Sequence, residues 1–301
     1  MSPLPLSRGD WLRALVVIVI WGLNFVVMKL GLESLSPMLL GALRFAGASL
    51  PFLLWVPRPT LPWRTLVAYG LAQGVGQFGL LFLGLHWGMT AGMASVVMQT
   101  QAFFTLIMAA TLLGESARRS QWLGLGVSLV GLLLIAGSHG EGARQMTLIG
   151  FVLTLGAAWM WAVSNMVVRR AAQAGAYDPL GFIVWSSLVP IVPFFALALW
   201  IDGPQQVWAQ LRAFDGRALF AVTYLALLAT LLAYSLWTRL LQRHPAGRVT
   251  PFSLLVPVVG LLAAMVLLNE RPAFWQWVGT GAVIVGMGIN QLGARWRGFG
   301  R

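Results

Sequence analysis

The sequence predicts an all-α integral membrane protein, with ten transmembrane helices arranged as two inverted five-helix repeats around a central cavity. The first reason is composition, because 58% of the 301 residues are hydrophobic and only 9% are charged. About a quarter of the residues of a soluble domain are charged, so this chain lacks the polar surface that water requires. The second reason is a block that recurs 155 residues later: Glu115, Trp122, Gly124, Gly126 and Gly131 are matched by Glu270, Trp277, Gly279, Gly281 and Gly286.

Further matched positions extend this duplication over most of the chain. We expect one repeat at residues 8–138 and a second at residues 145–297. Internal duplication is typical of membrane transporters, whose substrate sites lie between the repeats near the middle of the bilayer. The additional matches are Ala91-Gly92 with Ala246-Gly247 at an offset of 155, Asn24 with Asn165 and Lys29 with Arg170 at 141, and Ser36-Pro37 with Asp178-Pro179 at 142.

Each expected helix is a run of roughly 20 mostly apolar residues, and short connections with Pro, Gly or charge separate the runs. The first run follows Arg8 and Arg13 and contains no small-residue cleavage site, so we expect a retained span and not a signal peptide. The longest connection runs from Asp202 to Gly216. In order, the spans are residues 11–31, 36–56, 64–84, 92–113, 120–138, 147–169, 179–201, 217–238, 247–268 and 273–294.

The basic residues predict the orientation, because cytoplasmic loops carry an excess of Lys and Arg. Both termini are therefore expected in the cytoplasm. Five spans per repeat is an odd number, so the second repeat is inverted with respect to the first. Fourteen cations then lie inside: Arg8, Arg13, Arg58, Arg64, Arg118, Arg119, Arg169, Arg170, Arg239, Arg243, Arg248, Arg295, Arg297 and Arg301. Five lie outside (Lys29, Arg144, Arg212, Arg217 and Arg271), and Arg44 falls within a span.

These features resemble the drug/metabolite transporter superfamily, specifically its ten-helix proteins with two EamA domains. The resemblance covers nearly the whole chain and implies export of amino acids and related metabolites across a bacterial inner membrane. The richness in aromatic residues is most similar to the aromatic amino-acid exporter branch. The residues that carry the resemblance are Trp21-Gly22-Leu23-Asn24, Pro37, Arg44-Phe45, Gly114-Glu115 with Trp122, Gly124 and Gly126, and the echo at Asn269-Glu270.

The first and sixth spans each place a tryptophan and an asparagine at helical spacing. Trp21 and Asn24 share one face of the first span with Met28, and Trp161 and Asn165 share one face of the sixth span with Thr154. Polar side chains are costly in lipid and therefore informative. Two such faces turned inward would form a pocket with stacking surfaces and amide hydrogen bonds. The alternative, which the sequence leaves equally open, is that the asparagines only hold helices together.

Further candidates for substrate contact are glutamines and aromatic residues deep in the spans. Gln73 and Gln77 lie four residues apart on the third span, and two amides suit the ammonium and carboxylate of a zwitterion. Gln99 and Gln101 point about 200° apart on a regular helix, so at most one is expected to face the cavity, and Gln101 is the candidate. Trp185 and Tyr234 complete the set, while Trp159 is expected to pack away from it.

Arg44, Pro251 and Pro257 have other expected roles. Arg44 lies about 12 Å from the end of its helix, which favours snorkelling or pairing with helix-terminal carbonyls over attraction of a substrate carboxylate. Proline inside a span frees backbone carbonyls, which makes Pro251 and Pro257 candidates for a gating hinge, with a static kink as the equal alternative. Glu115 and Glu270 are expected to act as cap or hinge residues.

The residue types that are missing from the spans reduce the number of functions that fit the sequence. All eight acidic residues lie at span ends or in loops, so no buried carboxylate is available to carry a proton or sodium ion, and we expect movement without ion coupling. Catalytic and metal-ligand constellations are also missing, which disfavours a polytopic membrane enzyme and predicts no cofactor and no metal. The net charge of +12 is spread over loops and does not indicate nucleic-acid binding. The partners expected are a small-molecule substrate and the lipid bilayer, and a monomer is compatible with the pattern.

The sequence thus predicts an alternating-access exporter of small neutral or zwitterionic metabolites, with amino acids first and aromatic ones favoured. A multidrug or a nucleoside or sugar exporter is the alternative within transport. Lipophilic cations would favour a buried carboxylate, which the spans lack. Phosphorylated substrates would favour several deep basic residues, and only Arg44 qualifies.

Overall fold

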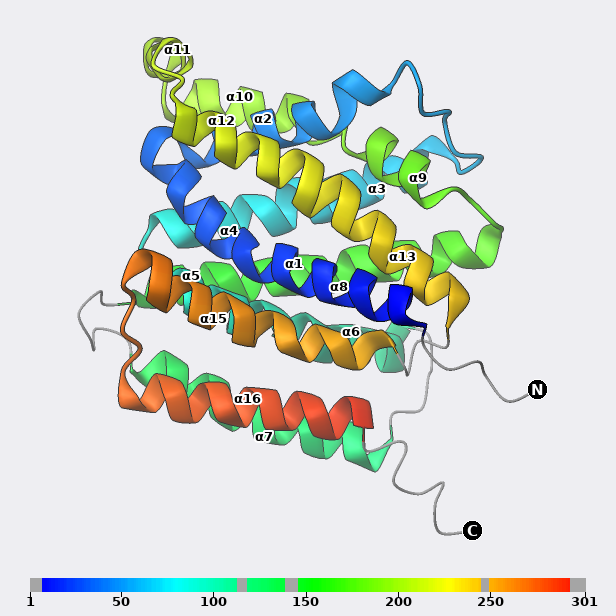
Figure 1. Ribbon diagram of the computed structural model, residues 1–301, viewed down its shortest axis with the longest axis vertical. Coiled ribbons are helices and arrows are strands. Elements are labelled where there is room, and N and C mark those ends of the chain that lie inside the picture. The colour runs from blue at the N-terminus through cyan, green and yellow to red at the C-terminus, as the bar shows by residue number, and fades with distance from the viewer. Residues whose placement is uncertain (1–6, 113–117, 139–145, 245–248, 293–301) are drawn as a thin grey trace.

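The computed structural model describes residues 7–112, 118–138, 146–244 and 249–292, and those residues form helices and connecting turns without strands. The bundle is elongated, and most helices run side by side along one direction (Figure 1). The first half contains α1 (Arg8–Ser34), α2 (Pro37–Ser49), η1 (Leu50–Phe52), α3 (Trp63–Tyr69), η2 (Gly70–Phe78), α4 (Gly79–His86), α5 (Ala91–Val97), η3 (Met98–Thr100), α6 (Gln101–Leu112) and α7 (Arg119–Gly137). The second half contains α8 (Leu148–Ala174), α9 (Pro179–Ser186), α10 (Ile191–Ile201), α11 (Pro204–Arg212), α12 (Gly216–Thr223), η4 (Tyr224–Leu232), α13 (Ala233–Arg243), η5 (Thr250–Leu254), α15 (Leu255–Leu268) and α16 (Phe274–Leu292).

End to end, these helical segments form ten rods, that is, ten continuous helical spans, at the positions of the ten predicted spans. The joined rods are α3 with η2 and α4, α5 with η3 and α6, α9 with α10, α12 with η4 and α13, and η5 with α15. Seven of the rods are long and apolar enough to cross a membrane, and Phe252–Leu268 is a shorter apolar helix. The prediction of an all-helical membrane protein is confirmed. One difference is α11, a short helix inside the connection Asp202–Gly216, which begins after Gly203 at a φ of 81°.

Local sequence signals explain where the second span of each half begins. Ser36 accepts a hydrogen bond from the Leu39 amide, and Pro37 is the first residue of α2. In the second half, the Asp178 carboxylate accepts from the Gly181 amide at 2.6 Å, and a proline again follows. A side-chain cap followed by proline suits a helix start, because the first helical N–H groups have no partner within the helix.

The third and eighth spans each contain a nine-residue π-helical segment at matching positions. Segment η2 starts at Gly70 and η4 starts at Tyr224, 154 residues later. A π-helical turn widens the helix and shifts the faces of the residues that follow, and such turns are frequent at functional sites. In both halves this segment lies at mid-span, at the level where a cavity between repeats is expected.

Contacts at one end of the bundle show that α1 and α8 run in opposite directions. Lys29, near the end of α1, donates to the carbonyls of Leu85 at 2.8 Å and Met89 at 3.1 Å. Thr147, the cap of α8, donates to the carbonyl of Trp87 in the same turn. The end of α1 and the start of α8 therefore meet at one end of the molecule, as inversion of the repeats requires.

The antiparallel pair α7 and α16 carries the pseudo-two-fold relation most clearly (Figure 1). A Cβ on Gly124 would lie 2.4 Å from the carbonyl oxygen of Gly286, and a Cβ on Gly131 would lie 2.5 Å from that of Gly279. Gly124 is equivalent to Gly279 in the repeat, and Gly131 to Gly286, so each contact is the symmetry mate of the other. We call this glycine-lined contact between α7 and α16 the glycine seam.

Candidate functional site

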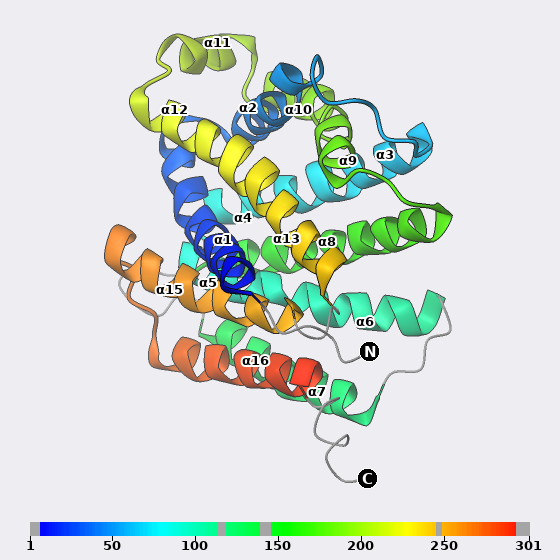
Figure 2. The same cartoon turned by 45° about the vertical axis from the view of Figure 1, so that its right-hand side comes forward.

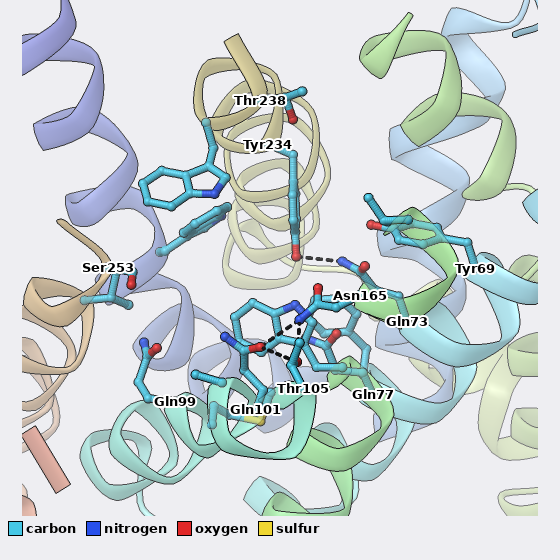
Figure 3. Close-up of a pocket in the computed structure, with 18 of the residues that line it drawn as sticks. Tyr69, Gln73, Gln77, Gln99, Gln101, Thr105, Asn165, Tyr234, Thr238 and Ser253 are labelled. Atoms are coloured by element: carbon cyan, nitrogen blue, oxygen red, sulfur yellow. Dashed lines mark hydrogen bonds between the residues drawn. The ribbon is translucent and has the colours of Figure 1, made fainter. Parts of the chain in front are cut away.

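A cavity of about 600 Å³ lies between the two halves of the bundle (Figure 3). Pockets of about 300–1,000 Å³ bury most of a small ligand. The polar and aromatic residues of its wall come from both repeats: Trp21, Asn24, Phe25, Arg44, Tyr69, Gln73, Gln77, Phe78, Gln99, Gln101, Thr105 and Gln121 from the first, and Trp161, Asn165, Arg169, Tyr177, Phe182, Tyr234, Trp237, Thr238, Ser253 and Asn290 from the second.

The cavity reaches the end of the bundle at which α1 begins and α16 ends. Its wall there includes Gln121 at the start of α7, Arg169 near the end of α8 and Tyr177 in the connection to α9. These elements meet at that same end in Figures 1 and 2. At the opposite end, which we call the closed end, the turn Trp87–Thr90 contributes nothing to the wall. Among the described residues, the cavity wall thus extends toward the first of these ends and stops short of the closed end.

On α1, Trp21 and Asn24 line the cavity and Met28 does not. The Trp21 indole donates to the carbonyl of Ala229 at 3.2 Å and packs edge-on against Tyr234, with ring centroids 5.1 Å apart. Asn24 is 7% exposed, and its Oδ1 is buried without a hydrogen-bond partner. Met28 lies in the apolar core, fully buried.

On α8, Trp161 and Asn165 line the cavity opposite α1. Asn165 Nδ2 donates to Gln101 Oε1 at 2.8 Å and to Thr105 Oγ1 at 3.1 Å, which ties α8 to α6 (Figure 3). Trp159 faces Phe104 outside the cavity wall, as expected from its helical angle. The two asparagines at matched positions are therefore in different situations, since one is bonded and the other has an acceptor without a partner.

The glutamines of the third span lie on η2 and face the second repeat. Gln73 Nε2 donates to the hydroxyl of Tyr234 at 2.7 Å (Figure 3), and Gln73 Oε1 accepts from Ser164 at 3.3 Å. Gln77 is 3% exposed, and its Oε1 has no partner. Gln73, Gln77 and Tyr234 thus form one side of the cavity. The Gln73 amide is held by hydrogen bonds, whereas the Gln77 amide has an oxygen without a partner.

Three expectations differ from the structure. Gln99 and Gln101 both line the cavity, and the expectation that at most one would do so is wrong, because the 3₁₀ segment Met98–Thr100 interrupts the α-helical rotation between them. Trp185 lies away from the cavity wall, where its indole donates to the carbonyl of Val56 at 3.0 Å and packs against Trp63.

The third expectation that differs from the structure concerns Arg44, whose side chain does not snorkel toward the end of its helix. The side chain is 1% exposed, lies over the ring of Phe78 with 3.7 Å from Cζ to the centroid, and donates from Nε and Nη2 to Thr230 Oγ1 at 3.2 and 3.1 Å. The Thr230 hydroxyl in turn donates to the carbonyl of Leu225, five residues earlier in η4. The π-helical turn thus supplies the partner that keeps the guanidinium inside.

The two candidate hinge prolines flank a change of helix type. Pro251 lies in the 3₁₀ segment η5, and Pro257 is the third residue of α15. The carbonyl of Pro257 accepts a hydrogen bond from Ser95 at 3.4 Å, which joins α15 to α5. The hinge role stays a prediction.

Sequence reasoning missed several wall residues, among them Phe78, Thr105 and Trp237. Trp237 packs against Trp21 in a tilted arrangement, with ring centroids 5.5 Å apart. It follows Tyr234 by three residues and therefore shares its helical face, so the spacing that identified Tyr234 could also have identified Trp237.

Comparison with known proteins agrees with this architecture. Residues 10–137 and 148–290 match the EamA-like transporter family. The chain belongs to the EamA-like transporter family. A protein of Escherichia coli (strain K12) named "Probable amino-acid metabolite efflux pump" is 39% identical over 97% of this chain and 98% of its own length. One of the same name from Salmonella typhimurium is 40% identical over the same shares. A crystal structure with 20% sequence identity matches 96% of this chain and 98% of its own with a TM-score of 0.62, which supports the fold.

Family membership makes the chain a membrane transporter and not an enzyme. The repeated glutamate of this EamA-like chain now has a visible role. Glu270 is 5% exposed, and its two carboxylate oxygens accept from the amides of Ala91 at 2.7 Å and Gly92 at 2.9 Å, the first residues of α5. Glu270 is therefore a helix cap, as expected, but it caps a helix of the other repeat. Glu115 lies outside the described residues.

Proposed function

We propose that this transporter exports amino acids and related small zwitterionic or neutral metabolites from the bacterial cytoplasm by alternating access, without ion coupling. The observation that carries the proposal is the cavity between the repeats, lined by amides and aromatic rings and, among the described residues, by no Asp or Glu. Amides offer donors and acceptors together, which suits a ligand that bears both an ammonium and a carboxylate.

The names of the relatives support this substrate class. Two bacterial proteins that match nearly the whole chain at 39% and 40% identity are both named "Probable amino-acid metabolite efflux pump". Their identity extends over nearly the whole length of both chains, so a shared class of substrate follows most simply.

The direction of transport rests on the distribution of charge. Fourteen of the twenty Lys and Arg residues belong to the end that we place in the cytoplasm. Two of these residues, Arg13 and Arg243, come from different spans and both reach Asp10, at 2.8 and 3.9 Å. With this orientation the cavity faces the cytoplasm, where an exporter takes up its substrate.

Aromatic amino acids are favoured within the proposed class. Trp21, Trp161, Tyr234 and Trp237 all line the cavity, and Trp21 already packs against Tyr234 and Trp237. Aromatic pairs add about 0.5–1.5 kcal/mol beyond the burial of apolar area. Phenylalanine and tryptophan would therefore gain more from this wall than threonine or homoserine.

The test is release from proteoliposomes that contain the purified protein and are loaded with a panel of amino acids, nucleosides and cationic drugs. We expect release of amino acids above the rate of protein-free liposomes, with phenylalanine and tryptophan ahead of threonine and homoserine. Release of cationic drugs alone, or of no amino acid, would overturn the proposal.

A further inference from the structure

Arg44 carries a buried charge for which the described residues supply no carboxylate. It forms no ion pair with them, and its Nη1 is buried without a hydrogen-bond partner. Its present contacts are the rings of Phe78 and Phe45 and the Thr230 hydroxyl, none of which carries a negative charge. Buried charges in proteins are normally paired, because an isolated one is costly. An arginine kept in this state beside a cavity calls for an anion from outside the protein.

Repeat symmetry shows that the scaffold does not need this arginine. Arg44 follows Pro37 by seven residues, and the residue that follows Pro179 by seven is Ser186. The two helices start with the same kind of cap, so the positions correspond. Ser186 is also buried, at 2% exposure, and donates to the carbonyl of Ile183 in its own helix. A small neutral residue therefore suffices at this place in the fold, and the guanidinium serves another purpose.

Two unpartnered acceptors lie in the same cavity wall. Asn24 Oδ1 and Gln77 Oε1 are buried without hydrogen-bond partners, on α1 and η2 respectively. With Arg44 Nη1, the wall contains one positively charged donor and two neutral acceptors that are all unsatisfied. An α-amino acid offers the complementary set, a carboxylate and an ammonium with three donors.

We propose that Arg44 binds the α-carboxylate of the substrate and that Asn24 and Gln77 receive its α-ammonium, so that the free carboxylate is the feature this transporter selects. This inference rests on the proposed function and adds the group by which the substrate is recognised. A guanidinium presents two parallel donors to a carboxylate, which gives direction as well as affinity. The three residues belong to the cavity wall while these atoms are buried, and rotamer changes of the kind common on binding would bring the atoms to the ligand.

The decisive experiment compares acids with their carboxyl-modified analogues. Release and binding are measured for phenylalanine, phenylalaninamide and phenethylamine, and for threonine and threoninamide, with purified protein in proteoliposomes and in detergent. The wild-type protein should prefer each amino acid over its analogues about ten- to a hundredfold, the ratio expected for one charged hydrogen bond. In Arg44→Gln the preference should fall to within about threefold, mainly through weaker binding of the acids.

Matched variants separate recognition from folding. Arg58→Gln is the control, since Arg58 is exposed and lies over the Trp63 ring at 4.6 Å outside the cavity wall, and its acid preference should equal that of the wild type. The apparent melting temperature of ligand-free Arg44→Gln should equal or exceed that of the wild type, because a buried unpaired charge is removed. Arg44→Lys keeps the charge without the fork and should retain part of the preference.

The outcomes distinguish this inference from the proposed function. If the wild type releases amino acids but treats phenylalanine and phenethylamine alike, the inference is wrong and the export function stands. The same holds if folded Arg44→Gln keeps a preference above tenfold. If the wild type releases no amino acid, the proposed function fails and the carboxylate assignment fails with it.

Discussion

Asn24 and Asn165 occupy matched positions in the two repeats, yet their side chains have different surroundings. Asn165 donates to Gln101 and Thr105 on α6, whereas Asn24 Oδ1 has no partner. The two interpretations that the sequence left open, substrate contact and helix attachment, are thus distributed over the two copies. The geometry favours attachment for Asn165 and substrate contact for Asn24.

Replacing each asparagine by leucine should separate these roles. Asn165→Leu removes two interhelical hydrogen bonds, which are worth about 0.6 kcal/mol each in membrane proteins, and should lower the free energy of unfolding by about 1 kcal/mol. Asn24→Leu should leave stability unchanged or raise it, because it removes an unsatisfied acceptor, but should weaken substrate binding. Thermal unfolding in detergent and substrate release from proteoliposomes measure the two effects. Equal losses of stability in both variants would contradict the division of roles.

Tyr234 and Tyr224 lie in the same span, one in the cavity wall and one outside it. The Tyr234 hydroxyl accepts from Gln73 in the cavity wall, while the Tyr224 hydroxyl donates to the carbonyl of Ile20 at 2.8 Å, away from the wall. Tyr234→Phe should slow release about three- to tenfold, as expected for a hydrogen bond worth 0.5–1.5 kcal/mol, because Gln73 loses its support. Tyr224→Phe also removes one hydrogen bond, so it should lower the melting temperature but leave the release rate at the wild-type value. A larger effect of Tyr224→Phe on release would show that Gln73 is not held for transport.

Individual residues also show which parts of the site could be predicted from the sequence. Helical spacing was enough to place Trp21, Asn24, Trp161 and Asn165 on inward faces, because these helices are regular where the residues lie. Trp185 and Arg44 were assigned differently because their partners, Val56 and Thr230, are far away in the sequence. Spacing within one helix carries no information about such contacts.

At the scale of single elements, the repeated Trp-x-Gly-x-Gly motif divides into two kinds of glycine. Gly124 is buried in the glycine seam, and a Cβ on its symmetry mate Gly279 would lie 2.5 Å from the carbonyl oxygen of Gly131. Gly126 and Gly281 are exposed, and an added Cβ would meet nothing within 4 Å. Small residues at helix contacts let two backbones approach closely in a membrane. Only one glycine in each copy of the motif serves that purpose.

Substitution of the two glycines by alanine should therefore have opposite effects. Gly124→Ala places a methyl group 2.4 Å from a backbone oxygen of α16, so the helices must separate, at a cost of about 1–3 kcal/mol. Gly126→Ala should be neutral or stabilising by up to about 1 kcal/mol, because alanine loses less conformational entropy in a helix. Thermal unfolding of the two variants in the same detergent is the measurement. Similar melting temperatures would show that the seam tolerates separation.

Helix content and helix order followed from composition and repeats, but irregular segments did not. The π-helical segments η2 and η4 have different sequences, since η2 contains three glycines and η4 contains none. Neither shows a local signal, and packing against the neighbouring helices decides their geometry. The same applies to the 3₁₀ turn at Met98–Thr100, which brought Gln99 to the cavity against expectation.

For the whole molecule, contacts within and between the repeats hold the closed end together. Glu270 caps α5, Lys29 holds the turn after α4, and Glu33 pairs with Arg217 at 3.4 Å. These contacts differ in strength. The Glu270 carboxylate is buried and takes two backbone donors, whereas the Glu33–Arg217 pair is exposed on both sides, and exposed pairs contribute little. In the proposed alternating-access cycle, we therefore expect opening at this end to require loss of the Glu270 contacts.

Cysteine labelling can test this, because the chain has no native cysteine. Met89 is fully buried at the closed end, and Met89→Cys would report its opening to a maleimide in detergent. Glu270→Ala removes a cap worth about 1 kcal/mol, so labelling should become about fivefold faster. Glu33→Ala in the same background is the control and should label at the unmodified rate. Equal rates in the two variants would remove Glu270 from the closing mechanism.

The charge distribution of the whole molecule predicts how transport is driven. A carrier coupled to protons or sodium needs a titratable or anionic group that meets the cavity during the cycle. Among the described residues the wall contains two cations, Arg44 and Arg169, and no Asp, Glu or His. Substrate should therefore move down its own gradient or by exchange, and the release rate of phenylalanine from proteoliposomes should be the same with and without a protonophore or an imposed pH gradient. External phenylalanine should accelerate release of the internal pool if exchange is the faster mode. A strict requirement for a pH gradient would place a proton-carrying group in the pathway and would reject uncoupled transport.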